Sequence, residues 1–192
     1  VNNAGLAFAV GGFGTVLKSA DGGQTWEPIA FDWQALLGDV LEPHFYDVEV
    51  SEAGVVTIAG EFELLMRSSD GGDTWEIMHK GDSSIFAIEL NDDGSGYAVG
   101  QEGRVLRTAD GGNTWDAVSV DTNANLLDVL TDREGTVHIT GIRTLLQSLD
   151  SGKSWTAIDA GDITSRWYQA LGLSDSGNVF LVGHSGRIVQ IK

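Results

Sequence analysis

Cysteine is absent from this 192-residue chain, and proline occurs only twice. Without cysteine the chain can form neither disulfides nor thiolate metal sites, and it carries no redox signature of its compartment. Long apolar runs are also missing: none reaches the roughly 18 residues that a membrane-spanning helix requires. We therefore expect no direct membrane insertion of this part of the protein.

Positive charge is scarce. The 11 Lys and Arg residues face 28 Asp and Glu residues, which gives a formal net charge of −17. Such a chain repels phosphate backbones, so we expect no nucleic-acid partner. Glycine, with 26 residues, and tryptophan, with six, are plentiful. Abundant glycine is typical of tight turns, and abundant tryptophan is typical of short strands that pack large rings. This composition therefore predicts an all-β protein.

One motif, Ser/Thr-x-Asp-x-Gly-x-Thr/Ser-Trp, occurs four times, at 19–26, 68–75, 108–115 and 148–155. The tryptophans of these motifs, which we call boxes, are 49, 40 and 40 residues apart. A fixed period of this length indicates a solenoid or a propeller. Short apolar runs precede each box, and turn residues separate the runs. Four short strands in about 40 residues match the size of one propeller blade.

We therefore predict a single β-propeller domain over 1–192, built of four-stranded antiparallel blades. Whole blades are expected at 45–84, 85–124 and 125–166, a partial blade with an inserted loop at 1–44, and a second partial blade at 167–192. The two partial blades supply three strands each, which overlap instead of completing one sheet. About five blades are thus wholly or partly present. We expect a fragment of a ring of six to eight blades whose chain continues upstream of Val1.

The box residues have structural explanations. A short Asp carboxylate can accept hydrogen bonds from amides of its own turn, and Gly can adopt a positive φ. A Trp ring can be buried against a neighbouring sheet. We predict these structural roles for twelve residues: Asp21, Gly23 and Trp26; Asp70, Gly72 and Trp75; Asp110, Gly112 and Trp115; Asp150, Gly152 and Trp155.

Oxygen-rich turns such as 91–94 also suit a hard cation like calcium. The spacing of acidic residues in an EF-hand is absent, so a solvated hairpin turn is the better interpretation. The four His residues show no metal-ligand spacing. We expect neither a bound metal nor a cofactor.

The boxes resemble the Asp-box, or bacterial neuraminidase repeat, of many propellers. A strand that ends in Gly, an apolar strand and a box, seen most clearly over 99–115, look similar to the photosystem II stability and assembly factor family. The resemblance covers nearly the whole chain through its repeats. It implies a non-catalytic scaffold or assembly factor for a membrane protein complex. Relatives found beside resistance-nodulation-division exporters imply an exporter or other integral membrane protein as partner, and a periplasmic or lumenal, hence extracytoplasmic, location.

That family grips its client with an arginine-bearing face. The matching positions here are Arg67, Arg104, Arg107 and Arg187, which the resemblance implies as partner-binding residues. Lys18, Gln147 and Gln190 replace the arginine that precedes the box in other copies. In so acidic a chain, ordinary surface ion pairs explain these arginines equally well.

A glycoside hydrolase or carbohydrate-binding propeller of the sialidase or xyloglucanase type is the alternative, because such proteins also carry Asp-boxes. The sialidase motif Phe/Tyr-Arg-Ile-Pro is absent. A pair of carboxylates would suffice for hydrolysis. Asp47 and Asp128 occupy the same place in two predicted inner strands, but Ala87 stands there in the blade between them. We expect the protein not to be an enzyme.

The first interval between boxes is about nine residues longer than the others, and the extra residues lie in 31–44. This segment holds more large apolar side chains than a solvated connection needs, and aromatic anchors are typical of interfaces. We predict that Trp33, Leu36, Leu37 and Leu41 contact a protein partner. The alternative is a loop that folds back on its own groove or forms a short helical turn.

Overall fold

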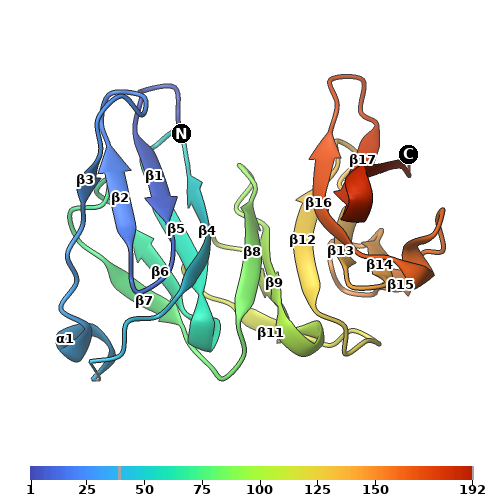
Figure 1. Cartoon of the computed structure of the whole chain (residues 1–192), viewed down its shortest axis with the longest axis horizontal. Helices are drawn as coiled ribbons and strands as arrows, with labels where there is room; N and C mark the ends of the chain where they lie inside the picture. Colours follow the sequence, from blue (N-terminus) through green and yellow to red (C-terminus); the bar gives the residue numbers. More distant parts are fainter. Residues whose placement is uncertain (39, 192) are drawn as a thin grey trace. The chain divides into compact units, whose positions relative to one another are not determined.

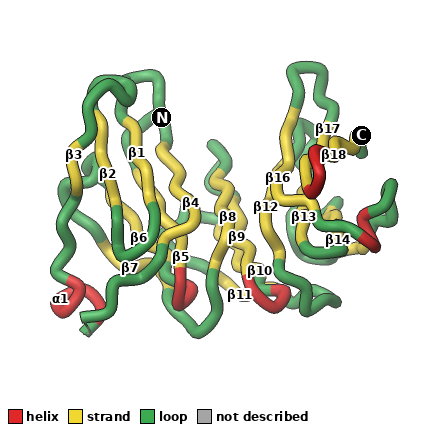
Figure 2. Tube along the Cα trace, in the orientation of Figure 1, coloured by secondary structure: helices red, strands yellow, loops and turns green. Residues whose placement is uncertain are grey.

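The structure, a computed structural model, describes residues 1–38 and 40–191. Within them eighteen strands form five antiparallel sheets, as the composition and the repeat predict (Figure 1). Short loops join successive strands, and the few helical turns are brief (Figure 2). Contacts within the chain define two compact units, Val1–Ile85 with Gly112–Thr114 and Phe86–Gly111 with Trp115–Lys192.

The first unit holds two sheets. One contains β1 (Ala7–Val10), β2 (Val16–Ser19) and β3 (Glu27–Pro28); the other contains β4 (Phe45–Val50), β5 (Val56–Gly60), β6 (Leu65–Ser68) and β7 (Glu76–His79). The connection between them contains α1 (Trp33–Leu37), and the 3-10 turn η1 (Glu61–Glu63) follows β5. Both sheets contribute to one buried cluster: Phe8, Val16, Trp33, Phe45, Val56, Ile58, Leu64 and Met66.

The remaining three sheets repeat the same strand order. They contain β8 (Ile85–Leu90), β9 (Gly96–Gly100), β10 (Val105–Thr108) and β11 (Asp116–Val118); β12 (Leu126–Thr131), β13 (Val137–Gly141), β14 (Thr144–Ser148) and β15 (Thr156–Ala157); and β16 (Tyr168–Leu173), β17 (Val179–Gly183) and β18 (Arg187–Gln190). The 3-10 turns η2 (Gln101–Gly103) and η4 (His184–Gly186) follow β9 and β17, and η3 (Ile163–Ser165) precedes β16.

The partial blades are those that the strand count predicts. Sheet β1–β3 corresponds to the last three strands of the repeat, because the box at 19–26 connects β2 to β3. Sheet β16–β18 corresponds to the first three strands and has no box. Four-stranded sheets lie between them in the sequence.

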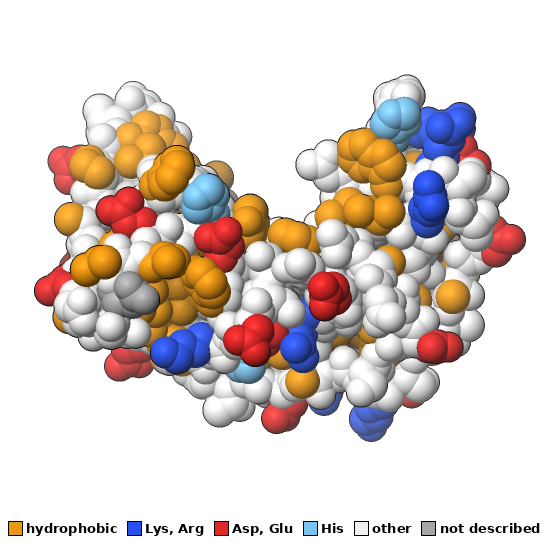
Figure 3. All heavy atoms as spheres, turned by 60° about the horizontal axis from the view of Figure 1, so that its bottom comes forward, with side chains coloured by type: hydrophobic (Ala, Val, Ile, Leu, Met, Phe, Trp, Pro, Cys, Tyr) orange, Lys and Arg blue, Asp and Glu red, His pale blue; other side chains and the backbone are white. Residues whose placement is uncertain are grey.

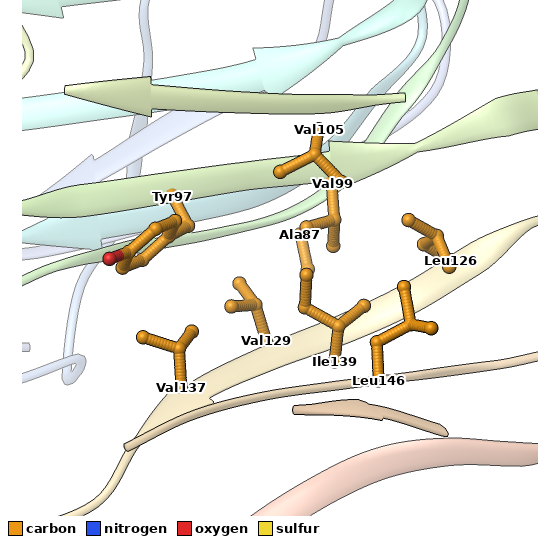
Figure 4. Packing of buried hydrophobic residues seen from close by; sticks show 9 residues of the cluster. All are labelled: Ala87, Tyr97, Val99, Val105, Leu126, Val129, Val137, Ile139 and Leu146. Carbon is orange, nitrogen blue, oxygen red and sulfur yellow. The ribbon is translucent and has the colours of Figure 1, made fainter. Parts of the chain in front are cut away.

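The core of the second unit lies between neighbouring sheets. Alternate residues of β9, Tyr97 and Val99, meet Val137 and Ile139 of β13 in one cluster (Figure 4). Every residue of β9 and β13 is buried, because both faces of these strands are covered. Strand β17 has only two of five residues buried.

The box turns form the hydrogen bonds predicted from their sequence. Asp70 Oδ1 accepts the amides of Asp73 (3.1 Å) and Thr74 (2.9 Å), and the Thr74 hydroxyl donates to Asp70 Oδ2 (2.6 Å). Ser68 Oγ donates to Asp70 Oδ1 (2.8 Å) and accepts the amide of Gly72 (2.7 Å). The boxes at 19–26 and 148–155 repeat this pattern.

These hydrogen bonds favour the ionised carboxylates. The Thr25 amide is the main cause that lowers the pKa of Asp21 from 3.8 to about 2. The Ser154 hydroxyl does the same for Asp150, whose pKa falls to about 2, and the pKa of Asp70 is lowered as well. The pKa shifts arise from hydrogen bonding within exposed turns, not from ion pairs.

The predicted positive φ is present at Gly23, Gly72, Gly112 and Gly152. At two of these glycines space is a second requirement. A Cβ on Gly72 would lie 2.6 Å from the ring of Phe8, and one on Gly152 would lie 2.6 Å from the ring of Tyr97. The boxes at 68–75 and 148–155 therefore pack closely against β1 and β9 of the preceding sheets.

Burial of the box tryptophans is only partly as predicted. Trp115 is buried, and Trp75 and Trp155 are half-buried, but Trp26 is 40% exposed, so the prediction is wrong for Trp26. Trp75 contacts the rings of Phe8 and Phe31 from the preceding sheet and connection. No aromatic side chain of residues 1–38 and 40–191 contacts the ring of Trp26, which donates its N–H to Gly23 O (3.0 Å).

Candidate protein-binding rim

In all five sheets the loop that begins at the glycine closing or following β1, β5, β9, β13 or β17 has the same backbone feature. The second residue after that glycine has a positive φ although it is not glycine itself: Phe13 (55°), Phe62 (60°), Glu102 (55°), Arg143 (58°) and Ser185 (61°). This left-handed conformation is unfavourable for a residue with a Cβ, and it is rarest for bulky side chains. Within the first unit we call these loops, together with the segments that lead into the next sheet, the rim.

Two of these strained residues are exposed phenylalanines, both in the first unit. Phe13 is 74% exposed and its ring lies 4.9 Å from that of His44, while Phe62 is 43% exposed. The loop at 11–14 is fastened to the inserted segment, because the Gly14 amide donates to Pro43 O (2.8 Å) and the Phe45 amide donates to Gly11 O (3.0 Å). Sequence reasoning missed both phenylalanines; aligning the loops that follow each Gly-ended strand would have found them.

The inserted segment contains the short helix α1. Asp32 caps its start by accepting the Ala35 amide (3.0 Å), and Gly38 ends it in the left-handed conformation. Trp33 is buried, stacks on Phe31 at 4.7 Å and lies 5.9 Å from the Phe45 ring. A Cβ on Gly14 would lie 2.7 Å from the Trp33 ring.

Trp33 thus lies as the folding-back alternative describes, and its contact with a partner stays a prediction. The physical reason is that the indole covers the edge of the first unit's own core. Leu36 and Leu37 are half-buried against the same cluster. Of the four predicted contact residues, only Leu41 is exposed, at 45%.

A groove of about 410 Å³ opens beside this segment. It is lined by Leu37, Leu41, Phe62, Leu64, Lys80, Gly81 and Asp82. In Figure 3 hydrophobic side chains gather at the left of the view, over the region of α1. The groove thus combines two residues of the inserted segment with one of the strained phenylalanines.

Glu63 holds the wall of the groove at 80–83. This carboxylate is buried, contacts His79 Nε2 (3.1 Å) and accepts the Ser83 amide (3.3 Å). The Gly81 amide donates to Phe62 O (2.6 Å), and a Cβ on Gly81 would collide with the Glu63 carboxyl group. The wall is therefore preformed, so a ligand need not order it.

The arginines that the family resemblance singles out are engaged within the protein. Arg67 Nη1 donates to Ser69 Oγ (2.6 Å), and Arg187 Nη1 pairs with Asp162 (2.6 Å). Burial raises the pKa of Tyr97, and a hydrogen bond from Arg107 partly offsets the rise. Arg104 is half-buried. Arg67 belongs to the first unit and the other three to the second.

The candidate catalytic acids bond to backbone amides. Asp128 Oδ1 accepts the Val129 amide (2.9 Å), and Oδ2 accepts the amide of Leu171 in the next sheet (2.6 Å). Asp47 accepts the Val48 amide (2.8 Å). Glu89, which sequence reasoning missed, accepts the amide (2.7 Å) and hydroxyl (2.5 Å) of Thr131, and burial raises its pKa. Asp128 and Glu89 thus link the first strands of neighbouring sheets.

No helix in 1–38 or 40–191 is long and apolar enough to cross a membrane. Over the same residues no group of three or more His, Asp or Glu side chains could hold a metal ion.

This fold is a β-propeller, and solved propellers match nearly the whole chain. The structure titled YCF48 bound to D1 peptide has a TM-score of 0.74 at 20% identity, over 99% of this chain and 62% of that one. YCF48 from Cyanidioschyzon merolae matches with a TM-score of 0.72 at 23% sequence identity, over 100% of this chain and 65% of that one. An ancestral GH74 enzyme matches with a TM-score of 0.76 at 18% sequence identity, over 99% of this chain and 30% of that one. No family model and no curated protein sequence matches.

The chain therefore spans slightly less than two thirds of the YCF48 structures that it resembles. This is consistent with the predicted fragment of a larger ring. At these identities the likeness establishes the fold, and the predicted resemblance to the photosystem II factor structures is confirmed at that level.

Proposed function

We propose that this protein is a non-catalytic scaffold that binds another protein, and that its rim in the first unit makes the contact. The observation that carries the proposal is the pair Phe13 and Phe62, large apolar rings that are exposed on strained backbone. Neither ring is fully buried in the core, and each residue adopts a left-handed backbone conformation that costs free energy. Binding of an apolar partner surface is the gain that offsets both costs.

The partner that we propose is a membrane protein complex, with an exporter as the particular case, and the compartment is extracytoplasmic. YCF48, whose fold this chain shares, was solved bound to a D1 peptide, which supports a protein ligand for such a propeller. Fractionation of cells that express the natural gene tests the location: recovery of the protein in the cytosol would contradict it.

A glycoside hydrolase or carbohydrate-binding propeller is the second candidate, favoured by the likeness to the GH74 enzyme. The hydrogen bonds of Asp128 weigh against it, because both its carboxylate oxygens already accept backbone amides. These hydrogen bonds give Asp128 a structural role that links two sheets, which accounts for the residue without catalysis.

The test compares affinity capture from source-cell membranes by the wild-type chain and by a Phe13→Ser, Phe62→Ser variant. We expect one set of membrane proteins to be recovered at least about tenfold less by the variant, as loss of two hot-spot rings implies. Leu149→Ser is the matched control, since Leu149 is 79% exposed and lies in the box of β14 and β15. Equal capture by all three proteins would refute the proposal, as would turnover of sialosides or xyloglucan that Asp128→Asn abolishes.

A further inference from the structure

We infer that the groove of the first unit binds an extended basic segment of the partner protein, in which a large apolar side chain lies next to Lys or Arg. The inference rests on the proposed function and adds the chemistry of the recognised segment. It is carried by the volume and lining of the groove and by acidic residues in or next in sequence to that lining.

The apolar part of the inference comes from the lining. Of the seven described residues that line a space of about 410 Å³, four are apolar: Leu37, Leu41, Phe62 and Leu64. That volume lies within the range of sites that hold small ligands or inserted side chains, roughly 300 to 1,000 Å³. The wall at 80–83 is already held in place by hydrogen bonds of Glu63 and of the Gly81 amide. An apolar side chain can therefore enter without ordering the site first.

The basic part comes from the charges. Glu42 follows Leu41 and Glu61 precedes Phe62 in the sequence, and Asp82 lines the groove itself. Among the described lining residues, Lys80 is the one cation. The Glu61 carboxylate accepts the His44 amide (2.9 Å), a hydrogen bond that leaves its negative charge in place. The formal charge of −17 on the whole chain adds an overall attraction for basic segments and a repulsion of acidic ones.

The probe is a display library of random nine-residue peptides, selected on the wild-type chain and counter-selected on a Leu41→Ser, Phe62→Ser variant. We expect the surviving peptides to be enriched in Leu, Phe or Trp beside Lys or Arg. Synthetic copies should bind the wild type and the Leu149→Ser control equally. Binding should weaken about tenfold on the groove variant, and about two- to fivefold on Glu42→Gln, Asp82→Asn and on raising salt, because exposed charge pairs are weak and screened.

Thermal melts of each variant establish that it is folded. Enrichment of acidic or uncharged peptides, or binding that ignores salt and both charge variants, would overturn the inference while the proposed function stood. Binding to vesicles of anionic phospholipid that the groove variant loses would also overturn it, in favour of a lipid surface. If no peptide depends on Leu41 and Phe62, the groove is not a binding site; capture that still depends on Phe13 would then leave the scaffold function intact.

Discussion

Replacement of Trp75 and Trp26 by alanine tests how the box stabilises the propeller. The two residues occupy the same box position in the same unit, and each donates its indole N–H to a glycine carbonyl oxygen, at 3.1 and 3.0 Å. They differ in their surroundings. The Trp75 ring lies 6.0 Å from that of Phe8 and 5.8 Å from that of Phe31, both in edge-to-face geometry. Trp26 is 40% exposed.

The magnitude follows from this difference. An aromatic pair contributes about 0.5 to 1.5 kcal/mol beyond the area it buries, so two pairs give Trp75 an excess of about 1 to 3 kcal/mol. Removal of a Trp from a packed site costs about 3 to 5 kcal/mol. We expect about 3 kcal/mol for Trp75→Ala. For Trp26→Ala we expect about 1 kcal/mol, because water replaces part of the ring and little cavity remains.

Urea unfolding followed by far-ultraviolet circular dichroism measures both values without relying on tryptophan fluorescence. At this chain length the melting temperature should fall by about 2 to 4 °C for each kcal/mol. Adding Phe8→Leu should be non-additive with Trp75→Ala and additive with Trp26→Ala. We attribute the larger loss at Trp75 to its contacts with the preceding sheet and not to the box turn. Equal losses of unfolding free energy for Trp75→Ala and Trp26→Ala would refute this.

Three further predictions concern other parts of the fold. Gly103→Ala should lower the melting temperature far more than Gly111→Ala. Both glycines have positive φ, but a Cβ on Gly103 would collide with a backbone carbonyl oxygen, whereas one on Gly111 would meet open space. Asp128→Ala should cost about 2 kcal/mol in urea unfolding, because it leaves an amide of the next sheet without its charged acceptor; a neutral result would show that the link is dispensable. Asp21 and Asp150 have lowered pKa values, so their contribution to stability is complete above pH 4 and is lost as the pH falls toward about 2. Asp150→Asn should flatten that acid limb, and an unchanged pH profile would contradict the role of the turn.

The repeat could be predicted from the sequence because the interactions that form it join residues close together in the chain. The hydrogen bonds of Asp70 join groups within four residues of it, so a short motif determines them wherever the chain forms the turn. Strand alternation and box spacing likewise depend on neighbours along the chain, which is why five sheets and two three-stranded ends could be predicted.

Contacts between distant residues decided the rest. The sequence shows an apolar inserted segment, but only the packing of Trp33 between Gly14 and Phe45 places that ring in the core and leaves Leu41 exposed at the groove. The exposure of Trp26 and the engagement of Asp128 by the Leu171 amide depend in the same way on which sheet lies beside each residue. A motif specifies its own turn, whereas burial and the availability of a side chain are set by neighbours that the chain brings together from tens of residues away.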